Sequence, residues 1–367
     1  MDLKSESWLH PFFESFRESV ISGRSPSSLI ISGDSGLGTA ALALDCARFY
    51  LCHERNSFQE EQHHCRSCGL FSDLSTGSHP DLLILCSSGA ASEKGEDLTY
   101  SFSDLFNDCG TSLYNDDNFS FDTAPASKQV KVDGVRRLNE WIFEGSALGH
   151  GKVAIVSNAH TMNESAANAM LKTFEEPADR TLIILLTKNL ESLPATIVSR
   201  AVKYQIPYVQ EDTALKYLRQ NLADSAQDES LKICLALSCN SPYKALNFFK
   251  AGLFDIVNQF VTGICGCLQK KQYDNCAINA LMTLPNELKA VVLQEFIVEL
   301  LKYKAGVSLK TLPVLQSHQA DLLAKIKAES LFEVYSELPG LYDNDRTLVI
   351  KAPVSMLRSW LYRLVTI

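Results

Sequence analysis

The 367-residue sequence lacks any run of about 18 apolar residues, the length that a membrane-spanning helix needs. It also lacks the basic and then apolar opening of a secretory signal peptide, because acidic and aromatic residues are spread through its start, MDLKSESWLHPFFESF. Both absences argue against membrane insertion and secretion. We therefore expect a cytoplasmic protein that makes no contact with a membrane.

An excess of basic residues is also missing, since 34 Lys and Arg face 43 Asp and Glu, for a net charge of −9. Segment 87–128 alone holds eight acidic residues and two lysines, a net charge of −6. The remaining chain is therefore nearly neutral, and the total charge does not exclude a nucleic-acid contact on one face. No strong basic stripe is present in the sequence.

Eleven cysteines, an odd number in a chain without a secretory signal, argue against a disulfide framework. Free thiols with one metal site fit this count better. The hydrophobic content of 46% and charged content of 21% are ordinary for a globular protein. The length predicts two or three domains.

Apolar runs alternate with amphipathic stretches up to residue 208, which predicts an α/β domain with a parallel sheet. Beyond residue 208 only helical patterns recur. Segment 87–128 is rich in Ser, Asp, Asn and Gly without a sustained period, so we expect an exposed insertion there. The strands are expected at 27–32, 81–86, 152–157, 181–187 and 202–207, and helices at 39–52, after an N-cap at Asp133, and after an N-cap at Asn163.

The segment ISGDSGLGTA, residues 31–40, follows the first expected strand and opens a helix. A phosphate-binding loop, G-x-x-x-x-G-K-[ST], belongs at such a place. Gly33, Gly36 and Gly38 keep its backbone pattern, but Thr39 replaces the lysine and Ala40 replaces the Mg²⁺-binding hydroxyl. We expect no ATP to bind productively. A purely structural glycine turn fits these residues equally well.

A nucleotide hydrolase also needs an Asp for Mg²⁺ and usually a Glu for water at the end of a neighbouring strand. The strand KVAIV is followed here by Ser157 and Asn158, neither of which is acidic. Two independent losses argue against an ATPase site.

The blocks LKTFEEP (171–177) and ATIVSR (195–200) stand in this order after KVAIVSNAH. Together they resemble the clamp-loader subunits of bacterial DNA polymerase III, of the AAA+ class, and the resemblance covers residues 27–207. It implies a P-loop NTPase-like α/β domain followed by an all-α lid and an all-α C-terminal collar domain. The expected bounds are 1–208, 209–252 and 253–367.

The resemblance implies an accessory subunit without an ATPase or polymerase site of its own. Its partners would be the motor (gamma/tau) and delta subunits and, through the assembled complex, the sliding clamp and primed DNA. Arg200, after Ser199, would enter the ATP site of a neighbouring subunit as an arginine finger, although Ala201 replaces the family's cysteine. The plain alternative is a surface arginine paired with a carboxylate.

Cys65 and Cys68 form a zinc-type pair, with Cys52 thirteen residues before them. The family's zinc module has four cysteines, and Gln62 stands at the position of the missing one. His64 is our first choice to complete a structural Cys₃His site, with His63 and His53 as alternatives. Three free thiols without a metal remain a further reading.

In the segment SPYKALNFF, residues 241–249, Lys244 takes the place of an arginine that senses nucleotide in active relatives. An ordinary solvated lysine on a helix is an equally good interpretation of this residue.

Two rival functions stay open. One is an ATP-binding motor subunit with an unusual loop, and the other is a zinc-dependent nucleic-acid adaptor.

Overall fold

The computed structural model divides into two compact units, which we describe separately. The first comprises Met1–Thr213 with Ser241–Lys244, and the second Ala214–Asn240 with Ala245–Ile367. The expected separation of a lid from a C-terminal domain stays a prediction. The structure describes residues 6–58, 65–72, 78–87, 102–109, 129–222, 227–270, 275–284, 286–315, 326, 328–337, 359 and 362–363.

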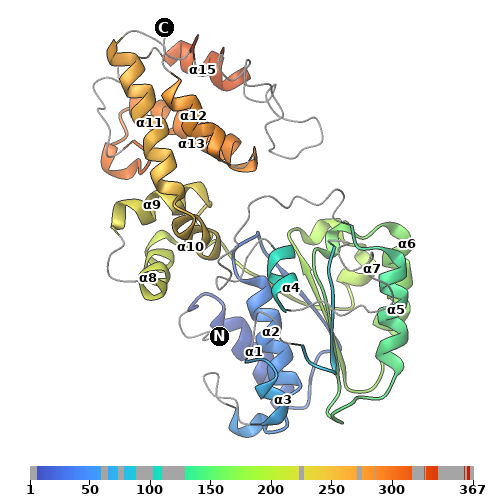
Figure 1. Ribbon diagram of the computed structural model, residues 1–367. Helices are drawn as coiled ribbons and strands as arrows, with labels where there is room; N and C mark the ends of the chain where they lie inside the picture. The colour runs from blue at the N-terminus through green and yellow to red at the C-terminus, as the bar shows by residue number, and fades with distance from the viewer. Residues whose placement is uncertain are drawn as a thin grey trace. The chain divides into compact units, whose positions relative to one another are not determined.

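A five-stranded parallel sheet of order β2-β3-β4-β1-β5 forms the centre of the first unit (Figure 1). Its inner strands β1, β3 and β4 are buried along their whole length, which is why they read as continuous apolar runs in the sequence. All five expected strands are present. Their bounds are β1 Ser28–Ser32, β2 Leu82–Leu85, β3 Lys152–Val156, β4 Thr181–Thr187 and β5 Val202–Gln205.

Helices cover both faces of this sheet (Figure 1). On one face, α2 packs against the sheet and is flanked by α1 and α4; on the other, α5 and α6 enclose a core that includes Leu138, Met170 and Ile183. The helices are α1 His10–Ile21, α2 Thr39–Tyr50, α3 Arg66–Gly69, α4 Phe102–Asp108, α5 Val132–Phe143, α6 Glu164–Glu175 and α7 Ala195–Val198, with 3₁₀ turns Arg55–Ser57, Ala159–Thr161 and Leu190–Ser192.

Two of the expected details need correction. Asp133 is not the N-cap of α5, because the helix starts one residue earlier after Lys131, and Asp133 lies in its first turn. The insertion is not exposed throughout, since α4 lies within it and Phe102, Leu105 and Phe106 are buried. By contrast, Asn163 is confirmed as the N-cap of α6, with its side-chain oxygen accepting from the Ala166 N–H at 2.8 Å.

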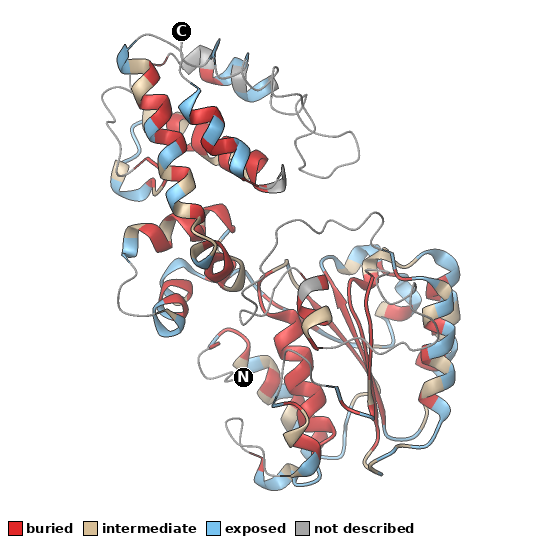
Figure 2. Cartoon of the chain, in the orientation of Figure 1, coloured by how far each residue is buried: buried red, intermediate tan, exposed pale blue. Residues whose placement is uncertain are grey.

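The second unit is helical, as expected. Buried residues recur along its long helix α11 (Leu253–Lys270), as the colours of Figure 2 show. Among them, Phe260 meets Phe296 edge to face at 5.5 Å between ring centroids. No single described helix is long and apolar enough to cross a membrane, and one bent pair, α10 with α11, passes on length and composition only. The helices are α8 Glu211–Asn221, α9 Asp228–Leu237, α10 Pro242–Lys250, α11 Leu253–Lys270, α12 Cys276–Thr283, α13 Asn286–Lys304 and α15 Ala328–Glu337, with a 3₁₀ turn at Leu309–Thr311.

Because α11 and α12 cross closely at Gly263, we expect Gly263→Ala to destabilise the protein. A methyl group there would lie 2.7 Å from the Ala277 backbone nitrogen, so the helices must separate. We expect a loss of about 1–3 kcal/mol in the free energy of unfolding. Gly266→Ala on the same helix meets nothing within 4 Å and is the matched control, expected to be neutral or stabilising by up to about 1 kcal/mol. Equal melting temperatures for both variants in calorimetry of the full chain would contradict the close crossing.

A second prediction concerns the buried carboxyl group of Glu299. Burial raises the pKa of Glu299 to about 7, although the Val314 and Leu315 N–H groups donate to its oxygens at 3.2 and 3.0 Å. The folded carboxyl keeps its proton to a higher pH than the unfolded one, with its pKa of about 4.3. Stability is therefore lost as pH rises through this range. Between pH 5 and pH 8 the melting temperature of the wild type should fall relative to that of Glu299→Gln. A difference independent of pH would refute the assignment.

Candidate functional site

The glycine loop connects the end of β1 to the start of α2. Gly36 and Gly38 have φ angles of +87° and +91°, a region that glycine enters without strain. A methyl group on Gly36 would lie 2.8 Å from Lys244 Cγ, and one on Gly38 would lie 2.7 Å from Leu9 Cδ1. Backbone conformation and packing therefore require both glycines, with or without a phosphate.

Protein groups also hold the loop from outside. The Trp8 indole N–H donates to the Leu37 carbonyl at 2.8 Å, and the Tyr243 N–H donates to the Gly36 carbonyl at 3.2 Å. The Tyr208 hydroxyl donates to Asp34 Oδ2 at 2.7 Å. These bonds keep the loop shape that lysine and phosphate would otherwise stabilise.

The two residues after β3 are buried and engaged by the inserted helix α4. The Ser157 hydroxyl donates to the Asp108 carboxylate, and the Asn158 side-chain amide donates to the Asp108 carbonyl at 2.7 Å. Asp108 was not among the site residues predicted from the sequence. A signal was present, because Phe102, Leu105 and Phe106 follow the spacing of one helical face.

Arg200 lies at the opposite edge of the sheet from the loop. Its carbonyl accepts from the Ser28 hydroxyl at 3.1 Å, and Ser28 begins β1, whereas Gly33 follows its end. Five residues of strand separate these edges by roughly 16 Å. Arg200 therefore cannot serve the loop of its own chain.

The Arg200 side chain is half-exposed and forms an ion pair with Glu175, with 2.9 Å between Nη2 and Oε1. Its Nη1 donates to the Thr196 carbonyl at 3.0 Å, and the Ser199 hydroxyl donates to the same carbonyl at 3.1 Å. An exposed pair of this kind contributes about 0–1 kcal/mol. These contacts hold the guanidinium in one place, but they are weak enough for another partner to replace them.

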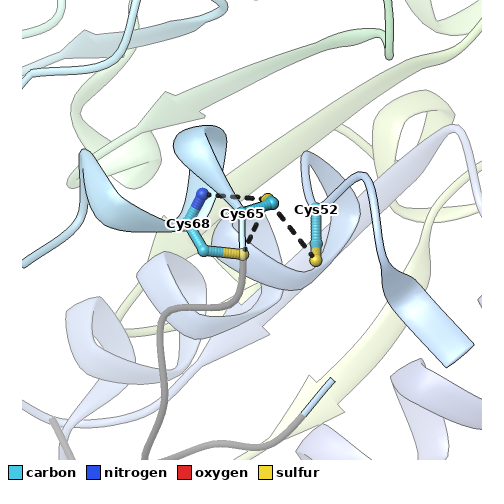
Figure 3. A group of neighbouring side chains, drawn as sticks. All are labelled: Cys52, Cys65 and Cys68. Carbon is cyan, nitrogen blue, oxygen red and sulfur yellow. Dashed lines mark hydrogen bonds between the residues drawn. The ribbon is translucent and has the colours of Figure 1, made fainter. Parts of the chain in front are cut away.

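The three cysteines converge where the end of α2 meets α3 (Figure 3). Cys65 Sγ lies 4.0 Å from Cys52 Sγ and 3.4 Å from Cys68 Sγ, and all three sulfur atoms lie within 4.8 Å of one another. Tetrahedral zinc with bonds of about 2.3 Å to sulfur requires separations close to these. The three sulfurs therefore fit three corners of a zinc site.

Hydrogen bonds to its sulfur lower the pKa of Cys52 to about 6. The main donor is the Cys68 thiol, and the Glu54 N–H also donates, at 3.3 Å. The pKa of Cys68 is raised, chiefly because its thiol donates to Cys52. One thiolate is thus available to a cation near neutral pH, and binding would release the remaining protons.

The fourth ligand is not among the described residues, in which only the three cysteines group in this way. His53 stacks instead on His150, with 3.6 Å between ring centroids. Gln62, His63 and our first choice, His64, lie outside the described residues. The Cys₃His set stays a prediction.

His79, which the sequence analysis did not single out, braces the cluster. Its Nε2 lies 2.9 Å from the Ser67 hydroxyl, which itself donates to the Leu51 carbonyl at 2.8 Å. Its Nδ1 accepts from the Asp81 N–H at 3.0 Å, so Nε2 carries the proton. Burial lowers the pKa of His79 to about 4 and keeps it neutral. Ser67 lies between Cys65 and Cys68 in the sequence, and Leu51 directly precedes Cys52. These hydrogen bonds therefore connect the Cys65–Cys68 segment to the segment that carries Cys52.

Comparison with known proteins identifies the family. The family model described as DNA polymerase III, delta subunit, matches residues 9–210. The chain belongs to this family. Together with the parallel sheet, this membership confirms the AAA+ type of fold and the clamp-loader resemblance that the sequence predicts.

Among curated proteins, the DNA polymerase III subunit delta' of Escherichia coli (strain K12) is 32% identical over 243 residues, covering 66% of this chain and 60% of that protein. The subunit delta' of Pseudomonas aeruginosa is 28% identical over 242 residues, covering 66% and 61%. A solved gamma-subunit-related protein of Thermotoga maritima covers 97% of this chain and 99% of that chain, at 14% identity and a TM-score of 0.42.

The chain thus matches about three fifths of the length of these curated relatives. It is a clamp-loader family member of the delta' type.

The cysteine cluster predicts that Cys65→Ser abolishes metal binding, because it removes the sulfur between the other two. The wild-type chain purified with zinc should carry about one metal ion by elemental analysis. Cys239→Ser, at an exposed cysteine outside the cluster, is the matched control and should keep it. A wild-type chain that carries no zinc after this treatment would support three free thiols instead.

Proposed function

We propose that this chain is a non-hydrolysing subunit of the DNA polymerase III clamp loader that supplies Arg200 to the ATP site of a neighbouring motor subunit. The loop lacks the phosphate-binding lysine, and the end of β3 lacks both acids. The family membership adds the setting in which such a subunit acts. No ATPase or polymerase activity of its own is expected.

The observation that carries the proposal is the position of Arg200. It lies at the amino edge of the sheet, away from its own loop, and its half-exposed side chain is held by a surface ion pair to Glu175 and one hydrogen bond to the Thr196 carbonyl. In an assembly a neighbouring loop could face this edge. A guanidinium placed against a γ-phosphate stabilises the charge of the transition state, by roughly 10³–10⁵ in rate in GTPases.

The proposed partners are the motor (gamma/tau) and delta subunits, with the sliding clamp and primed DNA reached through the assembled complex in the cytoplasm. Contacts to DNA would be to backbone phosphates, since no strong basic stripe is present. Zinc at Cys52, Cys65 and Cys68 would be structural, because it would hold α3 against the end of α2.

The test is single-turnover ATP hydrolysis by a reconstituted loader bound to clamp and primed DNA, with Arg200→Ala in this chain. We expect the fast phase to lose the contribution of one site, because that site's turnover falls by roughly 10³-fold or more. Clamp loading should fall with it, while assembly measured by gel filtration stays intact.

Two control variants distinguish an arginine finger from an arginine that only forms a surface ion pair. Glu175→Ala removes the ion-pair partner and should leave hydrolysis unchanged, as should Arg136→Ala at another exposed ion pair. An unchanged fast phase in Arg200→Ala would leave Arg200 as a surface residue.

The remaining alternatives have outcomes of their own. ATP hydrolysis by this chain alone would favour a motor subunit. Failure to join a loader, together with DNA binding by the isolated chain that Cys65→Ser and Cys68→Ser abolish, would favour a zinc-dependent nucleic-acid adaptor.

A further inference from the structure

Helix α4, from the acidic insertion, is an integral part of the first unit. Phe102, Leu105 and Phe106 are at most 1% exposed, and the Phe102 ring stacks on Phe71 with 5.3 Å between centroids. The helix contacts both α2 and β2 (Figure 1). A helix of seven residues is not stable alone, so these contacts hold it in place.

The end of α4 reaches the carboxyl edge of the sheet, where parallel α/β folds bind their ligands. There the Asp108 carboxylate accepts from the Ser87 N–H at 2.9 Å and from the Ser87 hydroxyl at 2.8 Å. The Ser157 hydroxyl donates to it as well. Protein donors thus reach both oxygens of this buried carboxyl group.

Ser157 and Asn158 stand where an active hydrolase carries its two acids. Acidic side chains at these positions would repel Asp108 and could not donate to it. A serine and an asparagine donate instead, the latter to the Asp108 carbonyl at 2.7 Å. The loss of the acids and the presence of α4 are thus chemically complementary.

Among the described residues, a small cavity lies between the end of α4 and the glycine loop. The cavity there has a volume of about 10 Å³, enough for at most about one water molecule. This cavity is too small for a nucleotide phosphate. Its walls come from the loop and the start of α2, from the residue after α4, and from the segments at the ends of β3 and β4: Gly33, Ser35, Thr39, Cys109, Asn158, Leu186, Thr187 and Lys188.

We propose that α4 and the residue after it block the chain's own nucleotide site: Asp108 occupies the space beside Ser157 and Asn158 where Mg²⁺ would bind, and Cys109 faces the glycine loop where the phosphates would bind. The chain then needs no nucleotide to stabilise this edge of its sheet, and restoring the lysine alone does not restore binding. This block concerns the chain's own crevice, so it holds whether or not Arg200 acts in a neighbouring site.

The test combines loop repair with removal of α4 and the residue after it in the full chain. Thr39→Lys with Ala40→Thr rebuilds the loop template, and a short Gly-Ser linker replaces residues 88–126. Such a linker can close the chain, because Ser87 accepts from the Asn158 amide at 3.2 Å and the Val130 N–H donates to Thr161 at 3.2 Å, so both ends lie at the end of β3. Binding of a fluorescent ATP analogue with Mg²⁺ is measured by titration.

We expect binding only when both changes are present, at least about 10-fold tighter than with loop repair alone. Equal binding by the loop-repaired chain with α4 intact would overturn the proposal. A folded double variant that binds nothing would also overturn it, because another group would then exclude the nucleotide.

A second measurement keeps the proposal testable if the shortened chain does not fold. Asp108→Ala leaves buried donors without an acceptor and should lower the melting temperature by roughly 4–8 °C. Asp133→Ala, at an exposed carboxylate, is the matched control and should shift it by no more than about 1 °C. Equal melting temperatures for these two variants would show that α4 is not seated in the crevice.

Discussion

The pairing of β1 between β4 and β5 is the constraint on which the functional geometry depends. Because the strands are parallel, their carboxyl ends all lie at one edge of the sheet. The glycine loop and the carboxyl ends of β3 and β4 therefore meet at that edge. The same pairing brings Arg200 to the other edge, beside the first residue of β1. A single strand thus separates the chain's own crevice from the arginine that faces outward.

Buried polar groups need partners, and at this crevice several of the partners are groups of the protein itself. In an active member, phosphates and Mg²⁺ would satisfy the loop amides and the acids at the strand ends. In this chain, Asp108 satisfies the donors at the end of β3, and side chains and backbone groups around the loop satisfy its carbonyls. The protein's own groups thus satisfy the buried donors at the end of β3 and hold the loop through its carbonyls.

The cysteine cluster follows the same logic on a smaller scale. α3 has only four residues and cannot hold its own position. Hydrogen bonds through Ser67 to His79 and Leu51 hold it beside the end of α2, and the three sulfur atoms meet as a result. A bound cation would strengthen an arrangement that the neutral histidine already supports.

The order of the strands and the helices α2, α5 and α6 were evident in the sequence, because strands buried on both faces read as apolar runs and α6 carries its own N-cap. Helix α4, within the acidic insertion, was not. The sequence also shows directly that the loop lysine and the two acids are missing, and it shows the Cys-x-x-Cys pair and the Ser-Arg motif. The sequence by itself thus determined the fold class, the family and the absence of the residues for ATP hydrolysis. The roles of Asp108 and His79 were not visible, since their partners Ser157 and Ser67 lie 49 and 12 positions away. Only the tertiary structure decided them, because hydrogen bonds in a buried crevice depend on which distant segments the sheet brings together.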